Sequence, residues 1–451
     1  MSDEIAAWLA EHEIRQVRVE GTNLEGSFIG KVVSPSKFLS GLTSGFAFAD
    51  VAFGLDMSNM PQFGFAMPDW RGDLLDIYLH VDLETLVEWA PGRASVIGDF
   101  RKADGEAISA CPRATLRRIT QDLSGLGYET LVAVEIEASL FEESIHEARA
   151  KGYRDLTPLG GTAGSCYHLA KSSDWEQYMR AVVERLDELG IPWEAYNDEA
   201  AAGQVEFNIA PADPVSTSDY WARTRQVMRE VAFDLGRTVT FMAKYSDEYG
   251  QASHLNVSLQ RDGHNAFFAE GGPSHVMNEF IGGLMATLAP ATSFALPMIT
   301  SYRRLVDLDG PPTTQTWGIA NKSAAVRAVV GHEKYSRLEY RTPGSDSNVY
   351  LVLAAVLAGG IAGMKNHLTP PAPFQDMAWC LPEGVDRLPD TISKATAALR
   401  ADNLLADVMG QDLIDYWAGT RDWEWLQFHT AGGEPDVGLT QWESNRYFEL
   451  P

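Results

Sequence analysis

The chain has 451 residues, of which 45% are hydrophobic and 22% charged, as is usual for a globular protein with material for two or three domains. Its formal net charge of −26 argues against nucleic acid and anionic membranes as partners. The three cysteines (Cys111, Cys166 and Cys380) are widely spaced, which favours a reducing compartment, and we expect the first two to be ordinary small apolar residues. The acidic N-terminus does not resemble a signal peptide, so we expect a cytoplasmic protein.

The first hundred residues alternate short strands with turns. We expect a helix over residues 3–12 and strands over 17–19, 28–33, 74–80 and 94–99. Pro35 should end the second of these strands, and Asp104-Gly105 is a turn signal that closes the unit. The pattern predicts a small sheet-rich domain over residues 1–105.

Beyond this point, helices alternate with strands. Apolar residues have helical spacing over residues 116–126, 175–189, 219–235, 275–288 and 390–425, with a break expected at Gly419 in the last of these. The apolar run 349–364 is too short to span a bilayer and contains three glycines, which indicates a buried helix packed closely on a neighbour. We therefore predict a larger α+β domain over residues 106–451.

Four of the strand-like segments alternate between apolar and chemically reactive side chains. The reactive positions are Glu135 and Glu137 in 132–137; Gln204, Glu206 and Asn208 in 204–209; His254, Asn256 and Ser258 in 254–259; and Arg337, Glu339 and Arg341 in 337–341. One polar strand face is usually just solvated, but a cluster of carboxylates resists joint ionisation unless a cation compensates it. Carboxylates with one imidazole suit Mg²⁺ or Mn²⁺, and arginines suit phosphate or carboxylate groups. Together they indicate phosphoryl transfer.

In their order along the chain, these segments resemble the glutamine synthetase family. The resemblance is carried by residues 134–137 (V-E-I-E), 199–206 (E-A-A-A-G-Q-V-E), 250–259, 301–305 (S-Y-R-R-L), 317–327 and 337–341 (R-L-E-Y-R). It implies an N-terminal β-grasp domain and a catalytic domain with a curved antiparallel sheet flanked by helices. It also implies a homo-oligomer, a dodecamer of two hexameric rings, with active sites between neighbouring subunits.

The resemblance assigns roles to individual residues. One divalent ion, Mg²⁺ or Mn²⁺, would be held by Glu137, Glu199 and Glu206, and a second by Glu135, His254 and Glu339. Glutamate would be bound by Gly250, Arg304 and Arg341, and ATP by Glu194, Asn256, Ser258, Lys334 and Arg337. Arg327 would face the transferred phosphate, with Lys322 where the family has arginine. The side-chain carboxylate of glutamate would attack ATP to give γ-glutamyl phosphate, which an amine then converts to an amide.

Departures from the family pattern concentrate at the amine end of this reaction. The segment that would form an ammonium pocket reads F-A-D-V-A-F-G over residues 48–54, with apolar residues in place of serines. Asp50 would substitute for the missing polar residues of this pocket. The position of the family's flap glutamate falls on Gly310, which leaves Asp309 or Asp307 as the candidate base. More space and less polarity predict an organic primary amine as substrate, giving a γ-glutamylamide.

Three alternatives remain open at this stage. The chain could be an ammonia-using glutamine synthetase in which Asp50 and Asp309 take over the displaced roles. It could be a non-catalytic paralogue that keeps only the assembly, although six retained ligands speak against this. It could also act on an acid other than glutamate, since Tyr249 stands where asparagine is usual.

Overall fold

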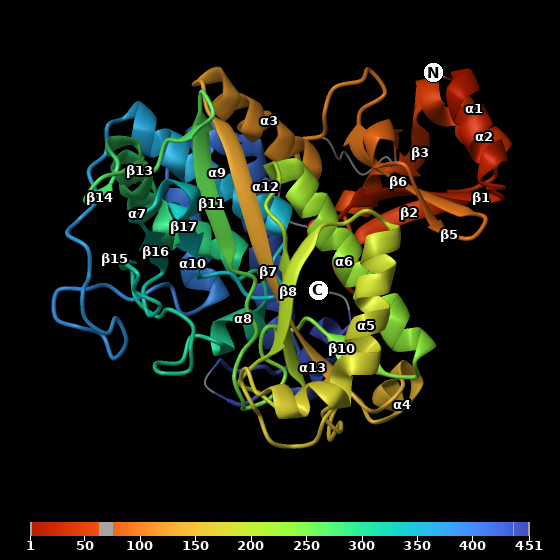
Figure 1. Ribbon diagram of the computed structural model, residues 1–451. Helices are drawn as coiled ribbons and strands as arrows, with labels where there is room; N and C mark the ends of the chain where they lie inside the picture. Colours follow the sequence, from red (N-terminus) through yellow and green to blue (C-terminus); the bar gives the residue numbers. More distant parts are fainter. Residues whose placement is uncertain (1, 63–74, 436, 450–451) are drawn as a thin grey trace.

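The computed structural model describes residues 2–62, 75–435 and 437–449 and confirms the α+β fold class. Two sheets dominate it: the N-terminal sheet is at the right of Figure 1, and the larger sheet runs through the middle. Residue 74, at the start of the strand expected over 74–80, lies outside the described residues.

The N-terminal sheet is mixed. Its strands are β1 (Gln16–Thr22), β2 (Phe28–Val33), β3 (Phe46–Ala49), β4 (Asp76–Val81), β5 (Val87–Ala90) and β6 (Arg93–Arg101). The order is β2-β1-β6-β4-β3 with β5 also on β6, and β1 pairs with β6 in parallel. Two helices accompany the sheet, α1 (Ser2–Glu11) and α2 (Pro35–Ser44), and α2 packs against β1 and β4. A helix across a mixed sheet agrees with the expected β-grasp arrangement.

Helix α2 was not anticipated from the sequence. Pro35, expected only to end a strand, is its first residue, where proline needs no N–H donor. Ser34 caps it by accepting a hydrogen bond from the Lys37 N–H at 3.3 Å. The proline is therefore both the end of β2 and the start of a helix.

The larger sheet carries the segments singled out from the sequence. Its strands are β7 (Glu129–Phe141), β8 (Trp193–Asp198), β9 (Gln204–Ile209), β10 (Thr238–Thr240), β11 (Leu255–Arg261), β12 (His264–Asn265), β15 (Trp317–Ile319), β16 (Val326–Val329) and β17 (Arg337–Tyr340). The order is β15-β16-β17-β11-β7-β9-β8, with β10 on β7 and β12 on β11. All these pairs are antiparallel except β15 with β16. A short hairpin, β13 (Phe268–Ala269) and β14 (Gly272–Pro273), stands apart.

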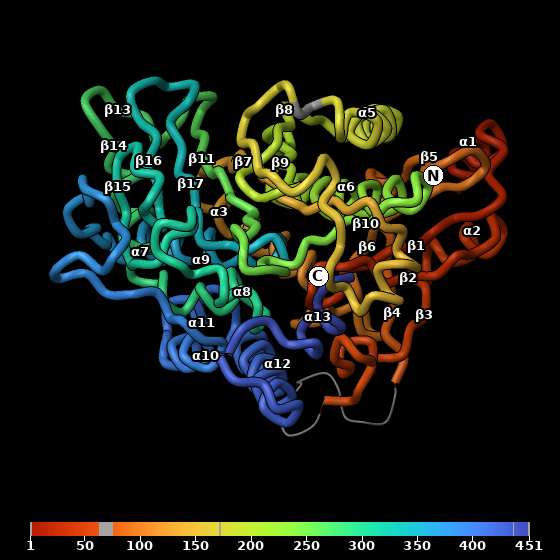
Figure 2. Tube along the Cα trace, turned by 90° about the horizontal axis from the view of Figure 1, so that it is seen from below, coloured from red at the N-terminus to blue at the C-terminus, as the bar shows by residue number. Residues whose placement is uncertain are grey.

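The helices of this larger part of the chain pack against the sheet or against one another. They are α3 (Pro112–Gly125), α4 (Ile145–Ala150), α5 (Ser172–Glu188), α6 (Pro214–Asp234), α7 (His275–Ala295), α8 (Ile299–Arg303), α9 (Val349–Lys365), α10 (Ile392–Ala401), α11 (Leu404–Met409), α12 (Gln411–Thr430) and α13 (Gln441–Tyr447). Short 3-10 turns are η1 (Asp50–Phe53), η2 (Leu83–Thr85), η3 (Leu169–Lys171) and η4 (Glu333–Tyr335). Figure 2 shows α10, α11 and α12 grouped beside α7 and α9.

Helix α9 is the buried helix predicted from the run 349–364, since each of those residues is buried. It lies against α7 so closely that a Cβ on Gly283 would be 1.9 Å from the Gly359 carbonyl oxygen. No helix in the described part of the chain combines the length and the apolar character needed to cross a membrane.

The expected break at Gly419 is wrong. Helix α12 runs through Gly419, which is buried, and the interruptions come earlier, at Asp402–Asn403 and at Gly410 with φ +96°. A mid-helix glycine costs only about 1 kcal/mol of helix propensity, and buried neighbours such as Trp417 offset that cost by packing.

Buried ion pairs join the N-terminal sheet to the rest. Arg113 of α3 is 1% exposed and donates to Asp82 and Asp99 on one side and to Asp219 of α6 on the other. A buried charge is tolerable only when it is paired in this way.

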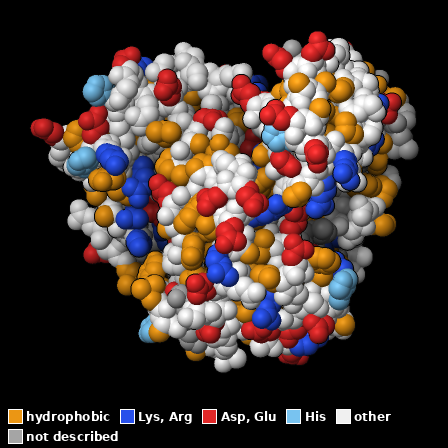
Figure 3. All heavy atoms as spheres, turned by 45° about the vertical axis from the view of Figure 1, so that its right-hand side comes forward, with side chains coloured by type: hydrophobic (Ala, Val, Ile, Leu, Met, Phe, Trp, Pro, Cys, Tyr) orange, Lys and Arg blue, Asp and Glu red, His pale blue; other side chains and the backbone are white. Residues whose placement is uncertain are grey.

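Whether the domain boundary falls at residues 105/106 remains a prediction. Figure 3 shows acidic side chains spread over one face, in keeping with the net charge.

Candidate active site

Strand pairing brings the carboxylates onto one side of the sheet. In the β7–β9 register, Glu137 is directly opposite Glu206, and Glu135 is opposite Asn208. On the other side of β7, β11 pairs with β17 so that Asn256 faces Glu339. Because side chains alternate between faces, the polar sets predicted from four separate segments point to the same side.

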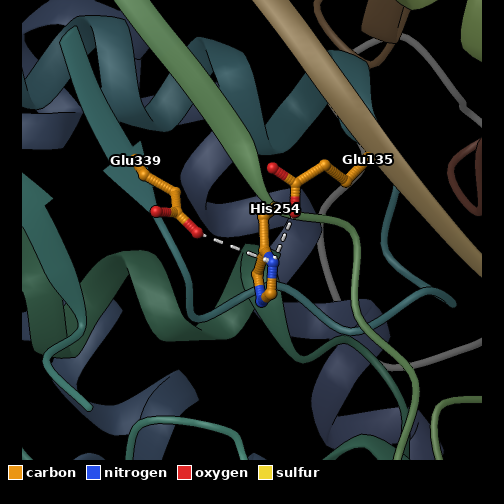
Figure 4. Close-up of side chains that lie close together, drawn as sticks. All are labelled: Glu135, His254 and Glu339. Atoms are coloured by element: carbon orange, nitrogen blue, oxygen red, sulfur yellow. Dashed lines mark hydrogen bonds and ion pairs between the residues drawn. The ribbon is translucent and has the colours of Figure 1, made fainter. Parts of the chain in front are cut away.

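Three of these residues form a compact cluster. The ligand atoms of Glu135, His254 and Glu339 all lie within 4.8 Å of one another (Figure 4). His254 Nδ1 is 2.8 Å from Glu135 Oε2 and 3.8 Å from Glu339 Oε1. Burial, and then the charge of Arg341, lower the pKa of His254 well below its usual value. The imidazole is therefore neutral near pH 7, the form that binds a metal ion.

The other predicted trio, Glu137, Glu199 and Glu206, lines the same cavity, but its carboxylate oxygens are less tightly clustered. Burial and the charge of Glu206 raise the pKa of Glu199 to about 7, and burial with Glu199 and Glu206 raises the pKa of Glu137 well above its usual value. Glu137 also accepts hydrogen bonds from Gln204 Nε2 at 3.0 Å and from the Ala252 N–H at 2.8 Å. These oxygens do not form a second set within 4.8 Å among the described residues.

The donor set fits divalent cations that prefer oxygen. Five carboxylates with one neutral imidazole suit Mg²⁺ or Mn²⁺ better than zinc. Burial first, and then the neighbouring carboxylates, raise the pKa values of Glu137 and Glu199, and a divalent ion would offset both costs.

Arginines border the carboxylates. Arg327 Nη1 is 2.7 Å from Glu339 Oε2, and Arg341 pairs with the other oxygen of the same carboxylate. Burial opposes ionisation of Glu339, but the charges of Arg341 and Arg327 outweigh it and lower the pKa of Glu339. This carboxylate is therefore charged near neutral pH and held in one orientation.

Arg304 is buried beneath the same site. Its Nη1 donates to the Thr342 carbonyl at 2.8 Å, and burial lowers its pKa to about 10, so it keeps its charge near pH 7. A Cβ on Gly250 would lie 2.5 Å from Arg304 Cγ. Glycine at 250 thus lets the backbone pass close to this arginine.

These groups line one cavity of about 320 Å³. Its lining contains all six predicted metal ligands, together with Gly250, Arg304, Arg341, Lys322, Arg327 and Asp309. Gln204, Tyr167, Tyr249 and Gly310 are also on its wall. We call this the catalytic cavity.

A second cavity, of about 420 Å³, is lined by all five predicted nucleotide-binding residues: Glu194, Asn256, Ser258, Lys334 and Arg337. It shares Glu135 with the catalytic cavity. Arg337 Nε donates to Asn256 Oδ1 at 2.9 Å, and Asn256 Nδ2 donates to Glu135 Oε1 at 3.0 Å. A hydrogen-bonded chain therefore leads from the second cavity to the metal-ligand cluster.

The two aspartates predicted at the amine end of the reaction have different surroundings. Asp309 reaches the catalytic cavity, but its Oδ2 is 2.8 Å from Lys244 Nζ. Asp50, in η1, is only 2% exposed and is not among the residues of this cavity in its own chain. A catalytic role for Asp50 thus depends on a neighbouring subunit and stays a prediction.

Sequence reasoning missed several residues here. Tyr167 and Lys244 were not singled out, because neither belongs to an alternating strand. Cys166 next to Tyr167 is exposed, so its interpretation as a small apolar residue was wrong, whereas Cys111 is buried as expected. The Cys166 N–H donates to the Glu199 carbonyl at 3.3 Å, which places Cys166 beside the site.

Comparisons with known proteins give matches over most of the chain. A model of the glutamine synthetase catalytic domain matches residues 109–447. The chain is 29% identical to a glutamate–isopropylamine ligase of Pseudomonas sp, over 99% of this chain and 98% of the relative. It is also 29% identical to type-1 glutamine synthetase 2 of Dictyostelium discoideum (96% and 84%) and to γ-glutamylethanolamide synthetase GlnA4 of Streptomyces coelicolor (99% and 95%). A solved complex of GmaS with ADP superposes with a TM-score of 0.83 at 25% identity, covering 98% of each chain.

Proposed function

This chain belongs to the glutamine synthetase family and is an ATP-dependent ligase, and we propose that it joins the γ-carboxylate of glutamate to an organic primary amine. The products are a γ-glutamylamide, ADP and phosphate. The observation that carries this proposal is the shared position of Glu135. It links a cavity rich in carboxylates and arginines to a cavity lined by the predicted nucleotide-binding residues.

The charge of each residue in the cavity determines which group it would bind. Arg304 and Arg341 suit the α-carboxylate of glutamate, and Arg327 with Lys322 suits the oxygens of the transferred phosphoryl group. Glu135, His254 and Glu339 would hold one divalent ion, and Glu137, Glu199 and Glu206 another. When bound, such ions neutralise charge on phosphate oxygens. The arginines orient the glutamate carboxylate for attack on the γ-phosphate, and the walls keep water from the acyl phosphate.

The acceptor end of the cavity supports a carbon-bearing amine. Tyr167 is 64% exposed and Tyr249 is 44% exposed, so both offer aromatic surface to a ligand. At Gly310, φ is +100° and a Cβ would meet nothing within 4 Å, which leaves space where a longer side chain would stand. Two of the relatives named above are a glutamate–isopropylamine ligase and a γ-glutamylethanolamide synthetase.

The direct test is phosphate release from ATP with glutamate and Mg²⁺ or Mn²⁺, across ammonium, putrescine, ethanolamine, isopropylamine and aniline. Products are identified by mass spectrometry. We expect one organic amine to give a kcat/KM at least about tenfold above that of ammonium, a discrimination that differential burial of a few carbons can supply. Preference for ammonium would make the enzyme a glutamine synthetase, as the similarity to the Dictyostelium protein allows. Metal binding without any turnover would indicate a non-catalytic paralogue.

We also propose that the enzyme assembles as a homo-oligomer, a dodecamer of two hexameric rings, so that Asp50 of one subunit completes the acceptor pocket of the next. Support comes from the position of Asp50, which is outside the catalytic cavity of its own chain. Light scattering coupled to size-exclusion chromatography measures the assembly directly. A monomer with full activity would contradict the proposal.

A further inference from the structure

A segment without helix or strand, residues 164–168, forms part of the rim of the catalytic cavity. It lies against the turn that follows β8: a Cβ on Gly164 would be 1.8 Å from the Ala200 carbonyl oxygen. The Cys166 N–H donates to the Glu199 carbonyl at 3.3 Å, and the Tyr167 N–H to the Asp198 carbonyl at 3.2 Å. The segment is thus attached directly to the residues around Glu199. We call it the rim segment.

The side chain of Asp198 anchors the rim segment through hydrogen bonds. Asp198 is 5% exposed, and its two carboxylate oxygens accept from different groups of the segment. Oδ2 accepts from the Ser165 hydroxyl, and Oδ1 accepts from the His168 N–H at 3.0 Å. A buried carboxylate needs such donors, and here the rim segment supplies them on both sides of Tyr167.

The conformation of the rim segment would not persist without such anchors. Cys166 has φ +32° and Tyr167 has φ +62°, so two successive residues with side chains occupy the left-handed region. Non-glycine residues adopt this region only when their surroundings impose it. The bonds to Asp198 lie directly before and after this pair and are the side-chain contacts that impose it.

The result is the placement of the Tyr167 ring. It lines the catalytic cavity near Glu199, and burial with the charge of Glu199 raises the pKa of Tyr167 to about 12, so the ring remains neutral. A neutral aromatic face beside carboxylates attracts a cation that carries carbon. Glutamate and ATP are anions and suit the arginines instead. Among the three substrates of the proposed reaction, the protonated amine is the one that this corner suits.

We propose that Asp198 is a positioning residue, which holds the rim segment so that Tyr167 forms the wall that binds the protonated amine substrate. This inference rests on the proposed ligase function but not on the identity of the amine. It assigns Asp198 no contact with substrate and no proton transfer.

The test is a kinetic comparison of Asp198→Ala and Asp198→Asn with the wild type, using the nitrogen substrate that the wild type prefers, ammonium included. Loss of two hydrogen bonds in Asp198→Ala should raise the KM for that substrate on the order of tenfold. The KM values for ATP and glutamate, and the concentration of Mg²⁺ or Mn²⁺ required, should change less than about twofold, because Tyr167 is the residue of the rim segment that lines the catalytic cavity. Asn keeps an oxygen for the His168 N–H and should restore most of the affinity.

A double-mutant cycle tests whether Asp198 affects the KM for the amine through Tyr167. Tyr167→Ala should raise the same KM, and adding Asp198→Ala to it should have little further effect, because both changes remove the same wall. Ser165→Ala, which removes one bond, should have a smaller effect in the same direction. Asp402→Ala is the matched control: its carboxylate also accepts a backbone N–H, from Leu405 at 2.7 Å, but it lies away from the cavity.

Other outcomes overturn the proposal. An equal rise in all three KM values, or an increased metal requirement, would mean that Asp198 acts through Glu199 or through stability alone. Full additivity with Tyr167→Ala would separate the two residues. A preference for ammonium in the wild type would refute the organic amine of the proposed function, while leaving the Asp198 comparison valid.

Discussion

Several charged and metal-binding groups of the catalytic cavity converge on Glu339. It is 3% exposed, close to His254, and bonded to Arg327 and Arg341. The same carboxylate would therefore bind a metal ion and hold the two arginines that face the anionic substrates. Its own charge is stabilised by these arginines, unlike the charges on Glu137 and Glu199.

Glu339→Gln should lower kcat by at least on the order of 100-fold, because an amide keeps the volume but is a poor ligand for Mg²⁺ or Mn²⁺. The more severe Glu339→Ala should abolish activity and leave assembly largely intact. Steady-state phosphate release and Mn²⁺ titration calorimetry measure both effects. Glu333→Gln, at an exposed glutamate paired with His264 at 2.9 Å, is the control. Undiminished turnover in Glu339→Gln would refute the metal site.

A second residue, Asp346, makes stability depend on pH. It is fully buried, accepts from Ser301 Oγ at 2.8 Å, and burial raises its pKa from 3.8 to about 6. The folded state therefore binds the proton more tightly than the unfolded state. Its contribution to stability is present below pH 4 and is lost as the pH rises through 6, by about 3 kcal/mol in all.

Asp346→Asn removes this ionisation. The free energy of unfolding of Asp346→Asn, taken relative to that of the wild type, should rise by about 1 kcal/mol from pH 5 to pH 8. The rise is smaller than the full loss because the wild type has already lost more than half of this contribution at pH 5. Thermal unfolding at the two pH values measures the difference. Asp262→Asn, in an exposed turn, should show no such change with pH. A pH-independent difference between Asp346→Asn and wild type would contradict the assignment.

At the scale of elements, the contact between α7 and α9 depends on glycine. A Cβ on Gly283 would approach the Gly359 carbonyl oxygen to 1.9 Å and the Gly363 Cα to 2.7 Å. Both partners are backbone atoms, so neither can turn aside as a flexible side chain would. The two helices can approach this closely only because side chains are missing at these positions.

Gly283→Ala should therefore destabilise the protein by about 2 kcal/mol or more, in the range of overpacked cores. Gly125→Ala, at the end of α3 where a Cβ meets nothing within 4 Å, should be neutral or stabilising. Urea unfolding followed by circular dichroism compares the two variants. Equal stability of both variants would show that α7 and α9 can separate without cost.

At the scale of the whole molecule, the catalytic cavity lies within a single chain, but the segment expected at its acceptor end does not line it. The expected contribution from residues 48–54 comes from η1, whose Asp50 is buried outside the cavity. If neighbouring subunits complete the site, each active site combines residues of two chains.

Co-expression tests this arrangement. Asp50→Ala and Glu339→Gln should each be nearly inactive alone, but mixed oligomers should regain part of the activity, because some interfaces combine two intact halves. Co-expressed Glu339→Gln and Arg341→Ala should regain none, since both residues line the same cavity of one chain. Two affinity tags and native mass spectrometry verify mixing. Inactive mixed oligomers in the first pairing would contradict a shared site.

Much of the candidate site was determined by the sequence alone. Alternation along a strand depends only on backbone geometry, so the shared faces of Glu135 with Glu137 and of Arg337 with Glu339 follow from their spacing. The charge cost of gathering carboxylates then predicts a cation. For the same reason, the apolar run of α9 was recognisable without a structure, because its composition requires burial.

Only the tertiary structure decided which groups meet across long separations in the chain. Lys244 pairs with Asp309, and Asp198 anchors the segment that presents Tyr167, yet none of these contacts leaves a local pattern in the sequence. Packing likewise carries α12 through Gly419, although local propensity predicts a break there. Local periodicity encodes which face a residue occupies, whereas long-range contacts depend on how the faces of distant elements pack together.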